Sequence, residues 1–280
     1  MNIQIIADSC CDVTPAMRKL LDIQIASLTI NVEDKVFVDD EQLDTTALLN
    51  AMKASKNAPS TACPSPDAYA QLMRSSEACF VVTLAGQLSG SYNAACVARD
   101  MVLEETPDKK IHVLQSNTAT AGETLLARLL RDKIDAGLDF DTIAQQMDAF
   151  TEEITTLFVL ESLDNLTKNG RISKFAGFMG TMLNLRPIMS ADHGVIFPLE
   201  KVRGTSNAMK RLVEIVAEGT RDMAAASRTL VITYCNCAER VQALKEEFAA
   251  KCPAFKEIIT LPTRGIGTVY AYDGGVVLAY

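Results

Sequence analysis

Short apolar runs alternate with helical patterns through the first half of the chain, and this alternation constrains the fold more than any other feature. The strand-like runs cover residues 3–7, 24–30, 79–83 and 111–114. Apolar strands separated by helix-length segments are typical of a parallel sheet, because each parallel connection needs a crossover and both faces of the sheet become covered. We therefore predict an α/β fold with a parallel sheet and helices on both of its faces in this half.

The segments between these runs carry helix signals. Pro15 follows Asp12 and Thr14, which suits the first turn of a helix. Further helical patterns cover residues 45–55, 66–73, 89–104, 124–136 and 140–151. The order of strands and helices agrees with a layered α/β domain over residues 1–153.

The second half has a different character. A strand is predicted at 156–160, a glycine-punctuated loop at 169–180 and short antiparallel strands around 195–202. A helix at 206–218, a strand at 229–233, a helix at 238–250 and strands near Ile258 and Val276 follow. We predict an α+β domain with a partly antiparallel sheet over residues 154–280, and a cleft between the two domains as the ligand site.

Charge and hydropathy exclude several classes of protein. The chain has 35 acidic and 27 basic residues, a net charge of −8, which disfavours nucleic acid and anionic lipid surfaces as partners. No apolar run reaches the roughly 18 residues that a membrane span requires, so stable membrane insertion is not expected. The N-terminal residues lack a secretory signal pattern, and we expect a cytoplasmic location.

Cysteine and histidine give weak signals. The eight Cys are irregularly spaced and the two His, His112 and His193, lie far from them, so reduced thiols are favoured and no metal site is predicted. Thiol-based redox or metal sensing through Cys10-Cys11 and the Cys235/Cys237 pair stays as an alternative.

Known catalytic motifs are mostly absent. The sequence contains neither a phosphate-binding P-loop nor a dinucleotide-binding glycine motif. Ser89, in Gln87-Leu88-Ser89-Gly90-Ser91, lacks the glycine frame of a nucleophile elbow. A serine hydrolase or acyltransferase using Ser89 is therefore the second hypothesis, and it needs a base such as His112 or His193.

Hydroxyl groups at strand-to-helix junctions are the stronger signal. Ser89 is a candidate N-cap, and the free backbone N–H groups of Gly90 and Ser91 suit a carboxylate or phosphate. Thr61 lies on a proline-containing loop before the helix predicted at 66–73, and its hydroxyl is the second one expected to face a ligand. The sequence thus predicts an anion site that includes Thr61, Ser89, Gly90 and Ser91.

Five motifs in order carry a family resemblance. They are Asp8-Ser9, Thr61 with Pro64-Ser65-Pro66, Leu88-Ser89-Gly90-Ser91-Tyr92, Asn169-Gly170-Arg171-Ile172-Ser173-Lys174 with Leu183-Asn184-Leu185-Arg186-Pro187, and Lys201-Val202-Arg203-Gly204. With these motifs spread over nearly the whole chain, the sequence resembles the DegV fatty-acid-binding family.

The resemblance implies a two-domain DegV-like protein that encloses one long-chain fatty acid, such as palmitate, stearate or oleate. The protein would be a carrier and not an enzyme, with the acid as its ligand and no cofactor, and a separate fatty acid kinase would phosphorylate the bound acid. By the same resemblance, Thr61 and Ser89 would hydrogen-bond the carboxylate, Arg171 would lie near it, and Arg203 would face the kinase at the portal. The Met-rich residues 178–183 would suit an adaptable wall of the apolar tunnel.

One residue departs from the family pattern. Tyr270 stands where the family carries a His, ahead of Asp273-Gly274-Gly275. Tyr donates a hydrogen bond but stays neutral near pH 7, so it cannot supply a cation beside a phosphate. We therefore place Tyr270 with Arg203 among the portal or partner contacts. The change weakens the expectation of kinase coupling more than that of lipid binding, and it is also compatible with a different carboxylic acid.

Overall fold

The computed structural model describes residues 2–172 and 184–280. The predicted parallel sheet is confirmed: β1 (Ile3–Asp8), β2 (Ile23–Ala26), β6 (Ala78–Val82) and β7 (Lys110–Leu114) form a four-stranded sheet in the order β2-β1-β6-β7. All three strand pairs in it are parallel. Ser173, Lys174 and the Met-rich residues 178–183, which the sequence analysis singled out, lie outside the described residues.

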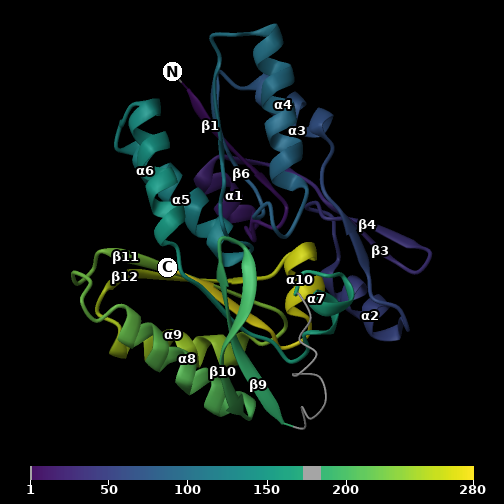
Figure 1. The fold of residues 1–280 in the computed structure, drawn as a ribbon, viewed down its shortest axis with the longest axis vertical. Coiled ribbons are helices and arrows are strands. Elements are labelled where there is room, and N and C mark those ends of the chain that lie inside the picture. Colours follow the sequence, from purple (N-terminus) through teal and green to yellow (C-terminus); the bar gives the residue numbers. More distant parts are fainter. Residues whose placement is uncertain (1, 173–183) are drawn as a thin grey trace.

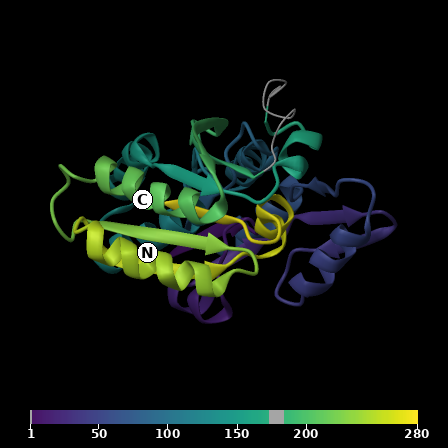
Figure 2. The same cartoon turned by 90° about the horizontal axis from the view of Figure 1, so that it is seen from below.

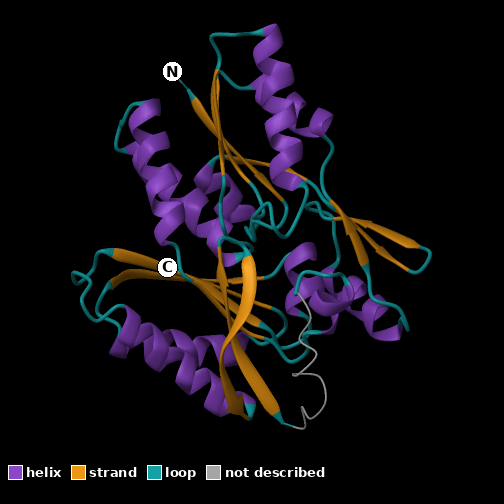
Figure 3. Cartoon of the chain, viewed as in Figure 1, coloured by secondary structure: helices purple, strands orange, loops and turns teal. Residues whose placement is uncertain are grey.

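Helices cover both faces of this sheet, as the alternation of buried side chains requires (Figure 3). Ile5 and Phe80 pack against α1 (Pro15–Leu21), α5 (Ala121–Asp135) and α6 (Phe140–Glu153) on one face. Ile6 and Val81, their chain neighbours, pack against α3 (Pro66–Ser75) and α4 (Ser91–Glu105) on the other. Successive strand residues point to opposite faces of the sheet, so side chains on both faces of each central strand are buried.

The predicted strand at 24–30 is wrong, because the structure divides it between two sheets. β2 ends at Ala26, and β3 (Thr29–Val32) instead joins β4 (Lys35–Val38) and β5 (Ser60–Ala62) in a small antiparallel sheet, followed by α2 (Thr45–Ala54). The Leu28 N–H donates to Ser9 Oγ, 3.0 Å away, so a side chain takes the place of the next bond to β1. β3 and β4 project from the body of the molecule (Figure 1).

The second half forms a partly antiparallel sheet, as predicted, and this sheet has six strands. Its strands are β8 (Thr156–Val159), β9 (Leu185–Asp192), β10 (Val195–Arg203), β11 (Arg228–Tyr234), β12 (Phe255–Pro262) and β13 (Val276–Ala279), in the order β10-β9-β8-β13-β11-β12. Only the β11–β12 pair is parallel. α8 (Thr205–Gly219) and α9 (Ala238–Lys251) cover one face and lie next to each other in Figure 2.

Helix α5 joins the two sheets. Its residues Leu126 and Leu130 pack with the parallel sheet, whereas Ala121 and Leu125 pack with Phe158 and other residues of the mixed sheet. The helix thus contacts β1 on one side and β11 and β13 on the other. The proposed domain boundary near residue 153 falls in the connection between α6 and β8.

Two short helices were not predicted, α7 (Asp164–Lys168) and α10 (Gly265–Ala271). Both lie near the junction of the sheets in Figure 1. Within the described parts of the chain, every helix is too short or too polar to cross a membrane.

Candidate functional site

The carboxyl ends of β1, β6 and β7 meet at one edge of the parallel sheet. The chain leaves β1 toward β2 on one side, while β6 pairs with β1 on the other, so the strand order reverses between β1 and β6. Ligands of open parallel sheets bind at such a reversal, beyond the carboxyl ends of the strands. Cys10, Ser89 and Thr118 lie in the three loops that follow these strands, and all three line one cavity.

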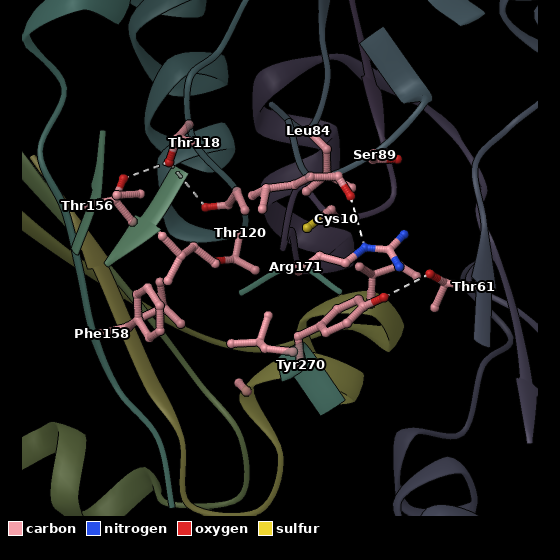
Figure 4. A pocket seen from close by; sticks show the side chains of 18 of the residues that line it. Cys10, Thr61, Leu84, Ser89, Thr118, Thr120, Thr156, Phe158, Arg171 and Tyr270 are labelled. Carbon is pink, nitrogen blue, oxygen red and sulfur yellow. Dashed lines mark hydrogen bonds between the residues drawn. The ribbon is translucent and has the colours of Figure 1, made fainter. Parts of the chain in front are cut away.

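The cavity lies between the two halves of the chain (Figure 4). Its lining comprises Cys10, Leu28, Thr61, Leu84, Leu88, Ser89, Thr118, Ala119 and Thr120 from the first half, and Thr156, Phe158, Leu160, Leu166, Arg171, Ala191, Ile196, Ile266, Tyr270, Ala271 and Val277 from the second. The cavity volume of ≈ 90 Å³ is several times the roughly 10–15 Å³ that one water needs by the same measure. The walls are mainly aliphatic, which suits an apolar ligand.

Arg171 brings a positive charge to one end of this cavity. Its Nε donates to the backbone oxygen of Leu88 at 3.1 Å and its Nη1 to that of Asn169 at 2.6 Å. Among the described lining residues there is no Asp or Glu to neutralise it. Two backbone carbonyls therefore orient the guanidinium, and its charge stays available for an anion.

Three hydroxyl groups lie at the same end (Figure 4). Thr61 Oγ1 and the Tyr270 hydroxyl share a hydrogen bond of 3.0 Å, although the residues are 209 positions apart in sequence. This bond uses one of their two protons, so one remains for a ligand. Ser89 Oγ accepts from the Ser91 N–H at 3.2 Å, and its own proton is free to donate. Arg171, Thr61, Ser89 and Tyr270 together form a donor set for a carboxylate.

The remaining predicted site residues lie elsewhere. The Ser91 side chain is fully buried; its hydroxyl donates to Asp8 Oδ2 at 2.6 Å and contacts the Tyr69 hydroxyl at 2.7 Å, so it is occupied within the protein. The structure has Gly90, not Ser89, at the N-cap of α4, and the helix begins at Ser91. Neither Gly90 nor Ser91 is part of the cavity lining.

The two predicted portal residues are separated in the structure. Arg203 is exposed at the end of β10, away from the cavity lining. Tyr270 lies in the cavity wall, on α10, at the end that carries Arg171. The position where the family has a His therefore faces the cavity in this chain.

Buried carboxyl groups hold the loops that carry the site residues. Asp8 Oδ1 accepts from the Cys10 N–H at 3.0 Å, and Oδ2 accepts from the Leu84 N–H at 2.8 Å and from Ser91. Asp8 thus joins the loops after β1 and β6 to the start of α4. Burial raises the pKa of Asp8, and it raises the pKa of neighbouring Glu123 well above its usual range.

The helix that carries Tyr270 is anchored by two further carboxyl groups. Asp39 accepts from the Gly265 and Ile266 N–H groups at 2.9 and 2.8 Å, and Asp12 accepts from the Arg264 N–H at 2.5 Å. Burial raises the pKa of Asp39 to about 6 and that of Asp12 to about 8. Both acids belong to the first half of the chain, so they fix α10 across the junction.

The structure offers no support for a hydrolase. No described lining residue is a His, Lys, Asp or Glu, so Ser89 has no base beside it. His112 bonds Asp148 on the outside of the parallel sheet, and His193 is exposed in the turn between β9 and β10.

Thiol chemistry is disfavoured as well. Burial raises the pKa of the Cys10 and Cys11 thiols well above the usual value, and it also raises those of Cys235 and Cys237. In the described parts of the chain, no group of three or more His, Cys, Asp or Glu residues is arranged to hold a metal ion.

Sequence reasoning missed part of the lining. Thr118, Thr120 and Thr156 line the cavity, and Thr118 Oγ1 contacts Thr156 Oγ1 at 2.8 Å. A usable signal was present for the first two, because they follow β7 and the carboxyl ends of neighbouring parallel strands meet at one edge. Thr156 carries no such signal, because it is the first residue of an ordinary-looking strand.

Among known protein families, the sequence model of the family described as "Uncharacterised protein, DegV family" matches residues 2–280 of this chain. The chain belongs to the DegV family. A DegV domain-containing protein of Streptococcus pneumoniae is 37% identical over 284 residues, covering 100% of this chain and 99% of the relative.

Two solved structures are similar over nearly the whole chain. A DegV family protein of Ruminococcus gnavus with vaccenic acid has a TM-score of 0.93 at 35% identity and covers 99% of each chain. The fatty acid kinase (Fak) B3 protein of Streptococcus pneumoniae, loaded with linoleic acid, has a TM-score of 0.90 at 36% identity, with 100% of this chain and 99% of that one covered. The two-sheet architecture described above is thus that of known DegV structures.

Proposed function

We propose that this DegV protein binds one long-chain fatty acid, such as palmitate, stearate or oleate, and presents it to a separate fatty acid kinase. The observation that carries the proposal is the cavity itself, which joins an unneutralised guanidinium and three hydroxyls at one end to mainly aliphatic walls. The protein acts as a carrier, with the acid as its ligand. The similarity to DegV proteins that hold vaccenic and linoleic acids supports this assignment.

The carboxylate belongs at the Arg171 end. A carboxylate that leaves water needs charge-assisted donors, and a guanidinium with hydroxyls from Thr61, Ser89 and Tyr270 supplies them. Arg171 keeps one terminal nitrogen beyond the two that bond carbonyls, so it can bond the ligand without giving up its own anchors.

The acyl chain belongs among Phe158, Val277 and the other apolar lining residues on and beside the mixed sheet, such as Leu160. Burying about 16 carbons contributes up to about 12 kcal/mol at about 0.8 kcal/mol per CH₂, before the cost of ordering chain and protein is subtracted. A ligand of this kind is expected to stay bound through purification.

Transfer of a phosphoryl group to the bound acid requires a second protein, because the cavity contains no nucleotide-binding motif and no catalytic base among its described residues. Similarity to the kinase-associated Fak B3 protein supports this partner. We assign the exposed Arg203 to the partner contact. Tyr270 stands where the resemblance places a His and cannot become a cation, so coupling to the kinase is expected to be weaker than lipid binding. The cytoplasmic location stays a prediction.

The test is direct. The purified protein is denatured and extracted, and the extract is analysed by mass spectrometry; a stoichiometric fatty acid is expected. Lipid-free protein is then titrated with palmitate and oleate. If the extract holds no acyl chain and neither acid binds, the proposal is refuted. Adding a fatty acid kinase and ATP tests the second part, in which Arg203→Ala is expected to spare binding and to lower acyl phosphate formation.

A further inference from the structure

A second group of hydroxyls lies across the cavity from the carboxylate end. Thr118, Thr120 and Thr156 are on the opposite side from Arg171 and Thr61 in Figure 4. All three line the cavity and are almost wholly buried, with exposed fractions of 1%, 7% and 6%. Their neighbours in the wall include Phe158 and Val277, so these hydroxyls lie where the distal part of an acyl chain belongs.

The protein does not use all of their hydrogen-bonding capacity. Thr118 and Thr156 share one bond of 2.8 Å, and Thr118 has a second, long contact of 3.4 Å to the backbone oxygen of Ala119. The buried Oγ1 of Thr120 has no partner among the described residues. A buried hydroxyl without a partner is costly, so a group that completes its bonds is favoured there.

The backbone at Thr120 is strained. The Gly122 N–H donates to the Ala119 oxygen at 3.0 Å and closes a turn in which Thr120 has φ +48° and ψ −111°. These angles are those of the first central residue of a type II′ turn, a position that favours Gly. A β-branched residue is unfavourable at positive φ, and such strain concentrates at functional sites. A threonine thus occupies this position despite the conformational cost of its side chain at positive φ.

Thr118 is held in place by close packing. A Cβ at position 122 would lie 1.9 Å from Thr118 Oγ1, so only glycine admits this side chain against the first turn of α5. The hydrogen bond to Thr156 fixes it from the other side. The hydroxyl of Thr118 is therefore oriented before any ligand arrives.

A structural role, in which these threonines only connect the two halves of the chain, explains part of these observations but not all of them. The Thr118–Thr156 bond does link the loop after β7 to the start of β8. Thr120 takes no part in it, and Val would fill the same space without an unpaired hydroxyl. A plain acyl chain offers Thr120 no partner, whereas an oxygen on the chain does.

We propose that the cavity selects fatty acids that carry a hydroxyl or keto oxygen on the distal part of the chain, bound by Thr118, Thr120 and Thr156. This inference rests on the proposed function, since it assigns the substrate class of the same cavity. An apolar tunnel without donors penalises such an oxygen, because the oxygen loses its water. Here the threonines replace that water.

Binding of matched acids tests the proposal. Lipid-free protein is titrated calorimetrically with stearic acid and its 9-, 10- and 12-hydroxy and 12-keto derivatives, and with palmitic and 16-hydroxypalmitic acid. At least one oxygenated acid is expected to bind about tenfold or more tightly than its parent, because a fitted polar site discriminates against a ligand that leaves it unpaired. If every oxygenated acid binds more weakly than its parent, the proposal fails while the proposed function stands. If no acid binds, both fail.

Substitutions assign the preference to the threonines. Thr120→Val and Thr118→Val keep the branched shape and remove the hydroxyl, and each is expected to bring the ratio of the Kd of the parent acid to that of the oxygenated acid down to about one. Thr229→Val is the matched control: Thr229 is also buried, and its hydroxyl has no partner among the described residues, but it lies outside the cavity lining. A preference that survives both cavity variants overturns the assignment.

Discussion

Replacing Arg171 with Gln tests the carboxylate site most directly. Arg171 is the only cation among the described lining residues, and its guanidinium is oriented by the backbone oxygens of Leu88 and Asn169. Gln is shorter and neutral, but it retains an amide that can donate to one of those oxygens. The substitution thus removes the charge with the least disturbance of the loops.

The expected loss follows from the contacts. A hydrogen bond to a charged group contributes about 1.5–3 kcal/mol, which corresponds to about a 10- to 150-fold weaker binding of palmitate. Part of any measured loss arises because at least one of the two backbone carbonyls loses its donor, and that part does not depend on the charge of the ligand. Comparing a charged ligand with a neutral one separates the two contributions.

Palmitic acid and hexadecanol are therefore titrated against lipid-free wild type and Arg171→Gln. We expect the acid to lose about 10- to 150-fold and the alcohol less than about threefold, so that the coupling between head group and residue is about 1.5–3 kcal/mol. Arg203→Gln is the control, since it removes an exposed charge outside the cavity lining. Equal losses for acid and alcohol would show that Arg171 only braces the loops, and an unchanged affinity for the acid would refute its role.

Three further predictions concern the site and its supports. Thr61→Val and Tyr270→Phe are each expected to weaken palmitate binding about three- to tenfold. Because the two side chains share a hydrogen bond, their losses of binding free energy should be less than additive in the double variant. Strictly additive losses, measured by calorimetry, would contradict this prediction. Gly122→Ala is expected to destabilise the protein by about 1–3 kcal/mol in urea denaturation, because its Cβ would meet Thr118, whereas Gly86→Ala, with no atom closer than 3.6 Å, should be nearly neutral. Burial raises the pKa of Asp12 from 3.8 to about 8. The folded state therefore retains a proton on this group, and the stability that the protonated group contributes is lost as pH rises from about 4 to 8. Asp12→Asn should flatten the decline of Tm between pH 6 and 8, and an unchanged slope of Tm against pH would contradict this prediction.

The sequence predicted the layers of the fold because its strongest patterns are local. Periodicity and capping residues located every long helix and most of the strands to within a few residues, but the eight-residue strand β9 was not predicted. The strand at 24–30 was misassigned because the break comes from a tertiary bond, Leu28 N–H to Ser9 Oγ, which leaves the apolar pattern intact. The helices α7 and α10 have five and seven residues, too few for a periodic pattern to show.

The site was predictable by residue type but not by pairing. Thr61, Ser89 and Arg171 come from motifs, and the structure places all three in one cavity lining. The bond between Thr61 and Tyr270 spans 209 residues, and no local pattern reports it. Ser91 has the same hydroxyl as Ser89 two positions away, yet the turn into α4 directs it to buried Asp8. A motif therefore names candidate donors, and only the packing decides which of them reach a ligand.

The cavity also changes how the aliphatic content of this chain is understood. Leu84 and Ile266 belong to one buried cluster, Phe158 and Val277 to another, and all four also line the cavity. Residues that stabilise the junction of the two sheets are thus also ones that would contact the proposed acyl chain, which would extend the same core. Ligand binding and folding are then linked: at a free ligand concentration of 100 times Kd, one site adds about 2.7 kcal/mol to the free energy of unfolding. Because the cavity lining comes from both halves of the chain, binding of the proposed acid would couple the stability of one half to that of the other.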